Sequence, residues 1–258
     1  MNKRLLRTRD EVLGKEFETN KCGKCVVVDY KGAYDVLVKF ENSDVIVSCQ
    51  LNNLRRGKVL NPFHPTFEGV GYIGVGKYSS VDIKPYNLWK NMLERAYNPR
   101  THTKRPTYKD TTVCEEWLNF QNFAEWCINQ KFFGLRDSDG ASYHLDKDLL
   151  VKGNKVYSPE TCCFIPLSIN SLLINASRIG GEYPVGVHYI KKTGLYSALL
   201  RYNGVKKRLG YFNTYACAFE EYKKAKEAYI KEVAEKWKGK IDGRVYETLI
   251  NWEISMEE

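Results

Sequence analysis

Residues 184–212 read PVGVHYIKKTGLYSALLRYNGVKKRLGYF, and three strands can be recognised in them, over 185–190, 195–202 and 205–212. Aromatic and β-branched residues are frequent in these segments, and turn residues separate them. The second and third segments are joined by Asn203-Gly204, the pair that suits a two-residue type I′ turn because both central residues need a positive φ. Apolar residues at helical spacing follow over 219–238. We therefore predict a three-stranded sheet covered by one amphipathic helix.

The same part of the chain is strongly basic. Residues 184–217 contain six Lys or Arg residues and no Asp or Glu. The whole chain has 258 residues and a formal net charge of +9. Such a balance favours association with polyanions, since basic side chains release counterions from phosphates and steer encounters over long distances. The local concentration of charge predicts a basic surface on the sheet.

Length and composition indicate two or three domains in an intracellular protein. No apolar run is long enough for a membrane span, and residues 1–17 lack the features of a signal peptide, so we expect a cytoplasmic protein without a membrane partner. The eight cysteines are scattered along the chain, which favours reduced thiols over disulfides. The oligomeric state is left open.

The fold class expected is α+β, in three parts. Residues 1–80 form a small antiparallel sheet or SH3-like β-barrel, followed by a linker rich in Pro and Gly. Residues 81–180 contain two helices with aromatic faces, then two short strands around Gly153-Asn154 and a short helix beginning near Ser168, which is a ββα outline. Residues 181–258 hold the basic sheet and its helix.

Two motifs resemble ligand sites without their required context. The string Gly69-Val70-Gly71-Tyr72-Ile73-Gly74 matches a nucleotide-binding pattern, but it follows a Pro-rich loop and no strand precedes it. We expect turn glycines there. Cys22 and Cys25 have the spacing of half a zinc site, but no second pair follows, so zinc is not expected.

The central region carries a further pattern, in which the order and spacing of several short segments can be compared with a known family. It resembles the phage HNH-type endonucleases, and the region after it resembles an AP2 DNA-binding domain, which in that family is commonly attached to the HNH part. The central segments are YNLWKNMLERAYNP (86–99), VCEEW (113–117) with Phe120 and Phe123, LDKD (145–148) and YSPE (157–160) with Cys162; the later ones are Gly186-Val187, YSA (196–198), LGYF (209–212), Ala218, Tyr222 and Ala225.

The resemblance implies a ββα finger that holds Mg²⁺ or another divalent metal against a phosphate, with a histidine acting as the base. Asp146 matches the metal ligand of the family, whereas Lys147 stands where the catalytic histidine is expected. A lysine is normally protonated at neutral pH and cannot accept a proton unless its pKa is lowered. His144 is a candidate for a displaced base, and Asn170 or Asn175 for a second metal ligand. Asp148 is either another ligand or a turn residue.

For the AP2-like part, the resemblance implies a sheet that lies in the major groove of DNA. Strand alternation turns Tyr196, Ala198 and Leu200 toward the helix, and Ser197, Leu199 and Arg201 toward the groove. Arg201 and Arg208 are the candidate base readers, Lys191, Lys192 and Lys206 the candidate phosphate contacts, and His188 belongs to either group.

Three functions remain open at this point. The preferred hypothesis is a phage-type protein that binds double-stranded DNA and has a degenerate or weak metal-dependent endonuclease activity. The first alternative is an active homing-type HNH endonuclease. The second is a non-catalytic protein that binds and inhibits a host factor, such as a defence protein, in the host cytoplasm.

Overall fold

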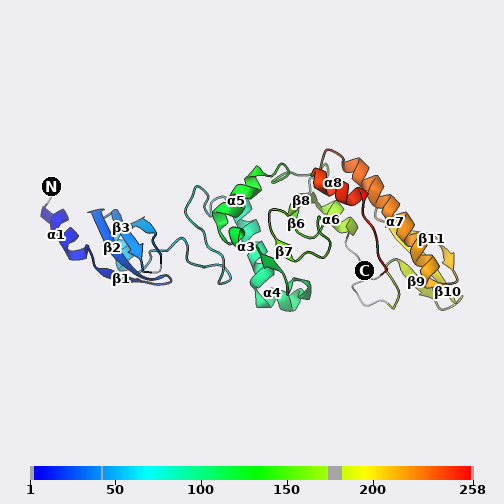
Figure 1. Ribbon diagram of the computed structural model, residues 1–258, viewed down its shortest axis with the longest axis horizontal. Helices are drawn as coiled ribbons and strands as arrows, with labels where there is room; N and C mark the ends of the chain where they lie inside the picture. The colour runs from blue at the N-terminus through cyan, green and yellow to red at the C-terminus, as the bar shows by residue number, and fades with distance from the viewer. Residues whose placement is uncertain (1–2, 42, 174–181, 257–258) are drawn as a thin grey trace. The chain divides into compact units, whose positions relative to one another are not determined.

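The computed structural model describes residues 3–41, 43–173 and 182–256, with the side chains of residues 3–7 left out. The chain divides into two compact units, whose helices and strands are labelled in Figure 1. The first contains residues 1–94 and 115–124, and the second contains residues 95–114 and 125–258. Both helices and strands are abundant and form several separate sheets, which confirms the α+β class. The three-part division expected from the sequence stays a prediction.

The first unit begins with a four-stranded antiparallel sheet in the order β1-β2-β3-β4. Its alternating residues Cys25, Val27, Val36, Val38 and Phe40 are buried in one core. Within described residues 3–41 and 43–60 the sheet stays open at β1 and β4, so the sheet alternative is confirmed and the barrel alternative is wrong. The elements of this part are α1 (Lys3–Val12), β1 (Glu16–Thr19), β2 (Gly23–Gly32), β3 (Asp35–Phe40), β4 (Ile46–Cys49) and α2 (Leu51–Arg55).

An aromatic core forms where helix α3 (Ile83–Tyr97) meets η2 (Glu115–Leu118) and the start of α5 (Phe120–Asn129). Trp89 is completely buried, and its indole N–H donates a hydrogen bond of 2.7 Å to the carbonyl of Trp117. Gly71 lies directly against Trp89, so that a Cβ at this position would be 2.9 Å from the indole ring. This close packing explains one glycine of the nucleotide-like string without a ligand.

The second unit contains short strand pairs whose partners lie far apart in the sequence. Strand β6 (Tyr143–Asp146) pairs antiparallel with β8 (Cys163–Pro166), and helix α6 (Leu167–Leu173) follows directly. The predicted helix near Ser168 is therefore confirmed. The remaining elements before the C-terminal sheet are α4 (Pro99–Lys104), η1 (Pro106–Tyr108), β5 (Thr112–Val113) and β7 (Val156–Tyr157).

The strands expected around Gly153-Asn154 do not pair with each other. Strand β7 pairs in parallel with β5, and the partner of β6 is β8. The Asn154 side chain binds the carbonyls of Lys147 and Val156, at 2.6 and 2.7 Å, and so fixes the intervening turn. All four residues of β8 are buried. Because β8 buries more apolar surface than β7, the pairing of β6 with β8 is the more favourable.

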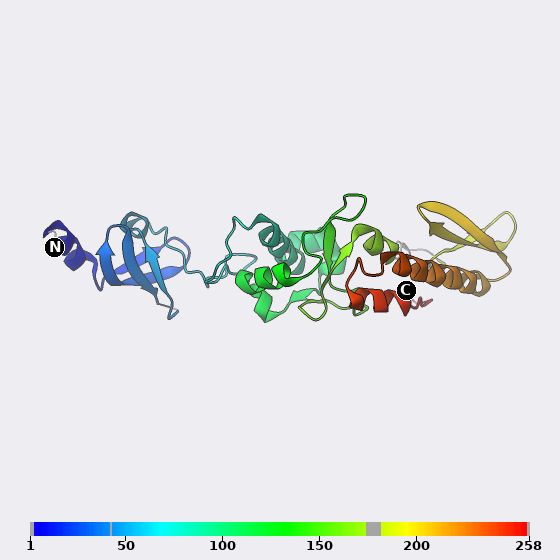
Figure 2. The same ribbon diagram turned by 90° about the horizontal axis from the view of Figure 1, so that it is seen from above.

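The C-terminal sheet has the order β11-β10-β9 and is covered by helix α7 (Figure 2). Its elements are β9 (Val187–Ile190), β10 (Leu195–Tyr202), β11 (Val205–Phe212), α7 (Tyr215–Trp237) and α8 (Gly243–Ile250). Asn203 and Gly204 have φ values of 47° and 81°, which confirms the predicted type I′ turn. Helix α7 begins four residues earlier than predicted, since the Thr214 hydroxyl accepts from the Cys217 amide and caps it.

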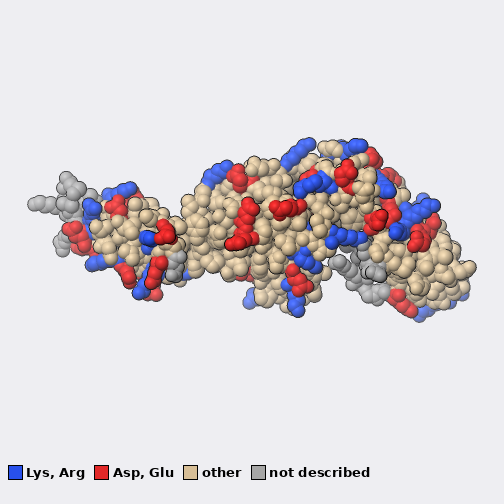
Figure 3. Space-filling view, in the orientation of Figure 1, with Lys and Arg blue, Asp and Glu red and all other residues tan. Residues whose placement is uncertain are grey.

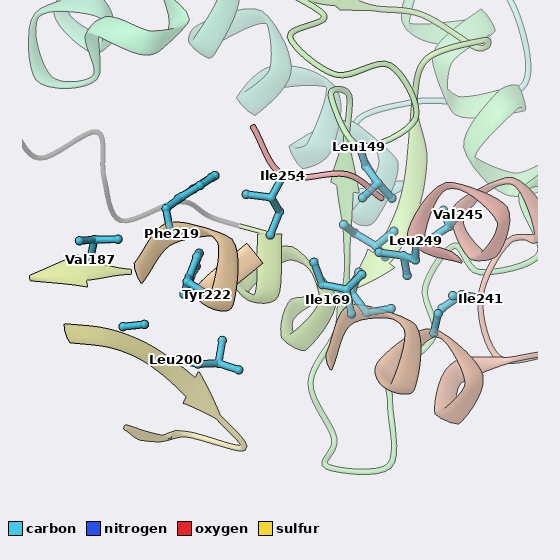
Figure 4. Packing of buried hydrophobic residues seen from close by; sticks show 14 of the residues in the cluster. Leu149, Ile169, Val187, Leu200, Phe219, Tyr222, Ile241, Val245, Leu249 and Ile254 are labelled. Carbon is cyan, nitrogen blue, oxygen red and sulfur yellow. The ribbon is translucent and has the colours of Figure 1, made fainter. Parts of the chain in front are cut away.

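Helix α7 packs on the sheet through one apolar core. Val187 and Leu200 point from the strands toward Phe219 and Tyr222 of α7 (Figure 4). The same cluster continues into Ile169 of α6 and further residues of β8 and α8. Within the described parts of the chain, no helix is both long and apolar enough to cross a bilayer.

Candidate nucleic-acid interface

The register of β9, β10 and β11 decides which side chains share each face of the C-terminal sheet. Ala198 and Leu200 are buried against α7, as the alternation predicted. Arg201 lies opposite Lys206, and Leu199 lies opposite Arg208. Directly opposite residues of an antiparallel pair project from the same face, so these four side chains lie on the face away from α7. A bulge at Ala198/Leu199 makes the alternation on β11 differ from that on β10.

The face away from α7, which we call the open face, therefore carries Lys or Arg side chains from β10 and β11 and a histidine from β9. His188 on β9 is opposite Ser197, and Ser197 is opposite Tyr211 on β11. The open face is made of His188, Ser197, Leu199, Arg201, Lys206, Arg208 and Tyr211. All of the charged members are exposed, whereas Ser197 on the central strand is only 2% exposed.

Arg208 is held in place by Tyr211. Its guanidinium donates a hydrogen bond of 2.6 Å to the Tyr211 hydroxyl, and its Cζ lies 5.1 Å from the centroid of that ring. Such an interaction lowers the freedom of the arginine before it meets a ligand, so less conformational entropy is lost on binding. Sequence reasoning did not select Tyr211. Strict strand alternation puts positions 208 and 211 on opposite faces, so the sequence carries no signal for this contact, which depends on the bulge.

The other predicted DNA contacts lie at the rim. Lys191 and Lys192 are exposed in the turn between β9 and β10. Lys207 is also exposed, but it lies opposite Leu200, so it projects from the face that carries α7. Lys206 and Lys207 are therefore neighbours in sequence with the same charge on opposite faces.

The outer surface of α7 has a different electrostatic character. Lys223 lies 4.0 Å from Glu227, and Lys238 lies 3.9 Å from Glu235. Basic and acidic side chains are interspersed along this helix (Figure 3). Its positive charges are thus balanced locally, unlike those of residues 184–217.

The central candidate residues are arranged around a turn that Asp146 stabilises. Oδ1 of Asp146 accepts hydrogen bonds from the amides of Asp148 (3.1 Å) and Leu149 (2.8 Å). Burial raises the pKa of the Asp146 carboxyl, and the charge of Asp148 raises it further, while the two amide bonds act in the opposite direction. Asp148 itself is exposed. This geometry explains Asp146 as a turn-forming residue.

Lys147 is buried, with 8% of its side chain exposed. Its Nζ lies 3.2 Å from Oδ2 of Asp148 and 5.8 Å from the ring centroid of Tyr157. Lys147 therefore takes part in an ion pair and a cation–π interaction inside the fold.

The remaining catalytic and metal-binding candidates form no hydrogen bond with Asp146 among the described residues. His144 is exposed on β6, and Asn170 is half-buried on α6. Among the side-chain contacts of the described residues, neither forms a hydrogen bond with Asp146. Asn175 lies outside the described residues.

The metal-binding role of Asp146 stays a prediction. In residues 3–41, 43–173 and 182–256, no three His, Cys, Asp or Glu side chains come together in a way that would hold a metal ion. One oxygen of Asp146 already accepts two amides. Cys22 and Cys25 of the zinc-like motif are buried members of the N-terminal core.

Comparison of the chain with models of protein families, with curated proteins and with solved structures gives no match. The resemblance to HNH nucleases and AP2 domains accordingly stays a prediction.

Proposed function

We propose that this chain binds double-stranded DNA through the open face of its C-terminal sheet. The observation that carries the proposal is the strand register, which puts Arg201, Lys206, Arg208 and His188 on one exposed face. No acidic residue occurs anywhere in residues 184–217 to offset them. A cationic face on a rigid support suits a polyanionic partner better than a neutral one.

The dimensions of a three-stranded sheet support the choice of duplex DNA. Adjacent strands are about 4.8 Å apart, so the backbones of the two outer strands are separated by roughly 10 Å. The major groove of B-DNA is about 12 Å wide and accepts an α-helix or a two-stranded β-ribbon. An arginine that enters the groove can form two hydrogen bonds with guanine, while lysines at the rim reach phosphates. Arg201 and Arg208 take the first role, and Lys191, Lys192 and Lys206 the second.

We further propose that binding, rather than cleavage, is the main activity. Asp146 stabilises a turn, and Lys147 is paired with Asp148. A nuclease of the HNH type needs a metal-binding carboxylate and a neutral base beside it. Because the Asp146 side chain is engaged in the turn and Lys147 replaces the usual histidine, we expect any nuclease activity to be weak.

The test measures binding of a short fluorescent DNA duplex by anisotropy, from about 50 to 200 mM salt. The Arg201→Ala/Arg208→Ala variant is expected to bind more weakly, by about 1–3 kcal/mol for each arginine that reads a base. A Lys224→Ala/Lys231→Ala variant serves as the control, since both residues are exposed on α7. Equal affinity of the two variants contradicts the proposed interface.

Cleavage is followed on the same duplex with Mg²⁺, Mn²⁺ or EDTA. Nicking that needs the metal and disappears in Asp146→Ala would restore the active endonuclease as the leading function. The absence of any binding at low salt would overturn DNA binding and leave the host-protein inhibitor as the better hypothesis.

A further inference from the structure

A second basic surface lies in the same compact unit as the C-terminal sheet, on helix α4 and the turn after it. Between Glu94 and Asp110 the chain contains five Lys or Arg residues and no acidic residue. We define the α4 patch as the four exposed members: Arg100, Lys104, Arg105 and Lys109. The fifth, Arg95, is half-buried, and its Cζ lies 5.8 Å from the ring centroid of Tyr108.

The backbone under the α4 patch is fixed by its own hydrogen bonds. Asn98 caps α4 by accepting from the amides of Arg100 and Thr101, at 2.9 and 3.3 Å. Nε2 of His102 lies 2.9 Å from the carbonyl of Arg95. Lys155, from the turn before β7, donates a 3.0 Å hydrogen bond to the carbonyl of Thr107. The side chains of the α4 patch therefore extend from a backbone that is held at both ends.

The α4 patch is bounded in the sequence by Glu94 and Asp110, but within the described part of the chain its members form no close ion pairs. Among the ion pairs of the described residues, none includes a member of the patch. Helix α7 shows the opposite arrangement, because its lysines alternate with glutamates. A basic surface that faces only solvent can contain acidic residues without loss. In a surface that binds phosphates, each carboxylate lowers the affinity.

We propose that the α4 patch binds backbone phosphates of the same DNA duplex whose groove the open face occupies. This inference rests on the proposed function and adds a second, sequence-independent interaction to it. Lysine and arginine contacts to phosphates supply affinity and position a protein on DNA without reading bases. The open face then supplies the base contacts.

The proposal predicts a change in salt dependence. The slope of log K against log salt is about −0.9 for each phosphate that a protein neutralises on B-DNA. Removal of the patch in Arg100→Ala/Lys104→Ala/Arg105→Ala/Lys109→Ala is expected to make the slope shallower by about 0.9 for each phosphate that the variant leaves without a cation. Since base contacts through the open face persist, discrimination between duplex sequences is expected to remain.

The matched control is Lys224→Ala/Lys231→Ala/Lys236→Ala/Lys240→Ala, which removes four exposed charges from α7 and the turn after it. Both quadruple variants lower the net charge by the same amount, so a general electrostatic effect appears in both. Circular dichroism and thermal unfolding establish that each variant is folded. An Arg100→Lys/Arg105→Lys variant keeps the charges and is expected to keep the wild-type slope.

The outcomes separate the two proposals. Equal slopes and affinities for the α4 and α7 variants overturn the α4 site while the open-face site can still stand. Loss of binding in the α4 variant, together with unchanged binding in Arg201→Ala/Arg208→Ala, supports the α4 site and overturns the open-face site. A wild-type protein that does not bind DNA at low salt overturns both.

Discussion

Gly186 precedes β9 at a place where the sheet and helix α7 come very close. Its φ is +77°, and a Cβ at this position would lie 2.1 Å from Cδ2 of Tyr222. Tyr222 is only 5% exposed and belongs to the core that joins α7 to the sheet. We predict that Gly186→Ala substantially destabilises the fold.

The expected magnitude has two parts. An alanine with a left-handed φ costs roughly 1–2 kcal/mol. Overpacking of a core adds typically about 1–3 kcal/mol, because the Tyr222 ring must move away from the new methyl group. The free energy of unfolding should therefore fall by about 2–5 kcal/mol. Gly194→Ala is the control, since Gly194 has a φ of +71° but nothing within 4 Å of an added Cβ.

The assay is urea unfolding followed by far-UV circular dichroism, with both alanine variants and the wild type under the same conditions. Gly194→Ala should show only the backbone part of the destabilisation. In a Tyr222→Leu background, Gly186→Ala should cost less than in the wild type, since the ring that it meets is gone. Equal destabilisation by the two glycine substitutions would refute the packing described here.

Two further predictions concern ionisable groups. Burial raises the pKa of Asp146 above the unfolded value of about 3.9, so the stability that its protonated form provides is lost as the pH rises through the folded pKa. Asp146→Asn should therefore gain stability relative to the wild type as the pH rises above about 4. A difference in unfolding free energy that stays constant with pH, measured by chemical denaturation, would contradict this. Cys217 is exposed, whereas Cys162 is buried and burial raises its pKa to about 12. A colorimetric thiol reagent should therefore react quickly with Cys217 in the native protein. A fast phase that persists in Cys217→Ser would show that another thiol is accessible.

The C-terminal sheet was the part most open to prediction from sequence. The pair Asn203-Gly204 predicts a type I′ turn, and strand alternation assigns Ala198 and Leu200 to the buried face. Both predictions succeed because they depend only on residues that are near in the sequence. The candidate site on this sheet followed from the same alternation. The hydrogen bond between Arg208 and Tyr211 depends on the bulge in β11, which strand alternation alone does not predict.

The central region could be predicted only in outline. Strands β5 and β7 have two residues each, and such short strands are decided by partners far along the chain rather than by local pattern. The two amides that bind Asp146 likewise depend on the local path of the backbone. A motif that gives only residue types therefore predicted a role for Asp146 without predicting the turn that its side chain stabilises.

The most direct test of the proposed interface compares Lys206→Ala with Lys207→Ala in DNA binding at low salt. The two residues are adjacent and exposed, but the register puts Lys206 on the open face and Lys207 on the face that carries α7. We expect Lys206→Ala to weaken binding and to make the salt slope shallower by about 0.9, while Lys207→Ala changes the slope little. Equal effects of the two substitutions, or a larger effect of Lys207→Ala, would contradict the claim that this face binds DNA.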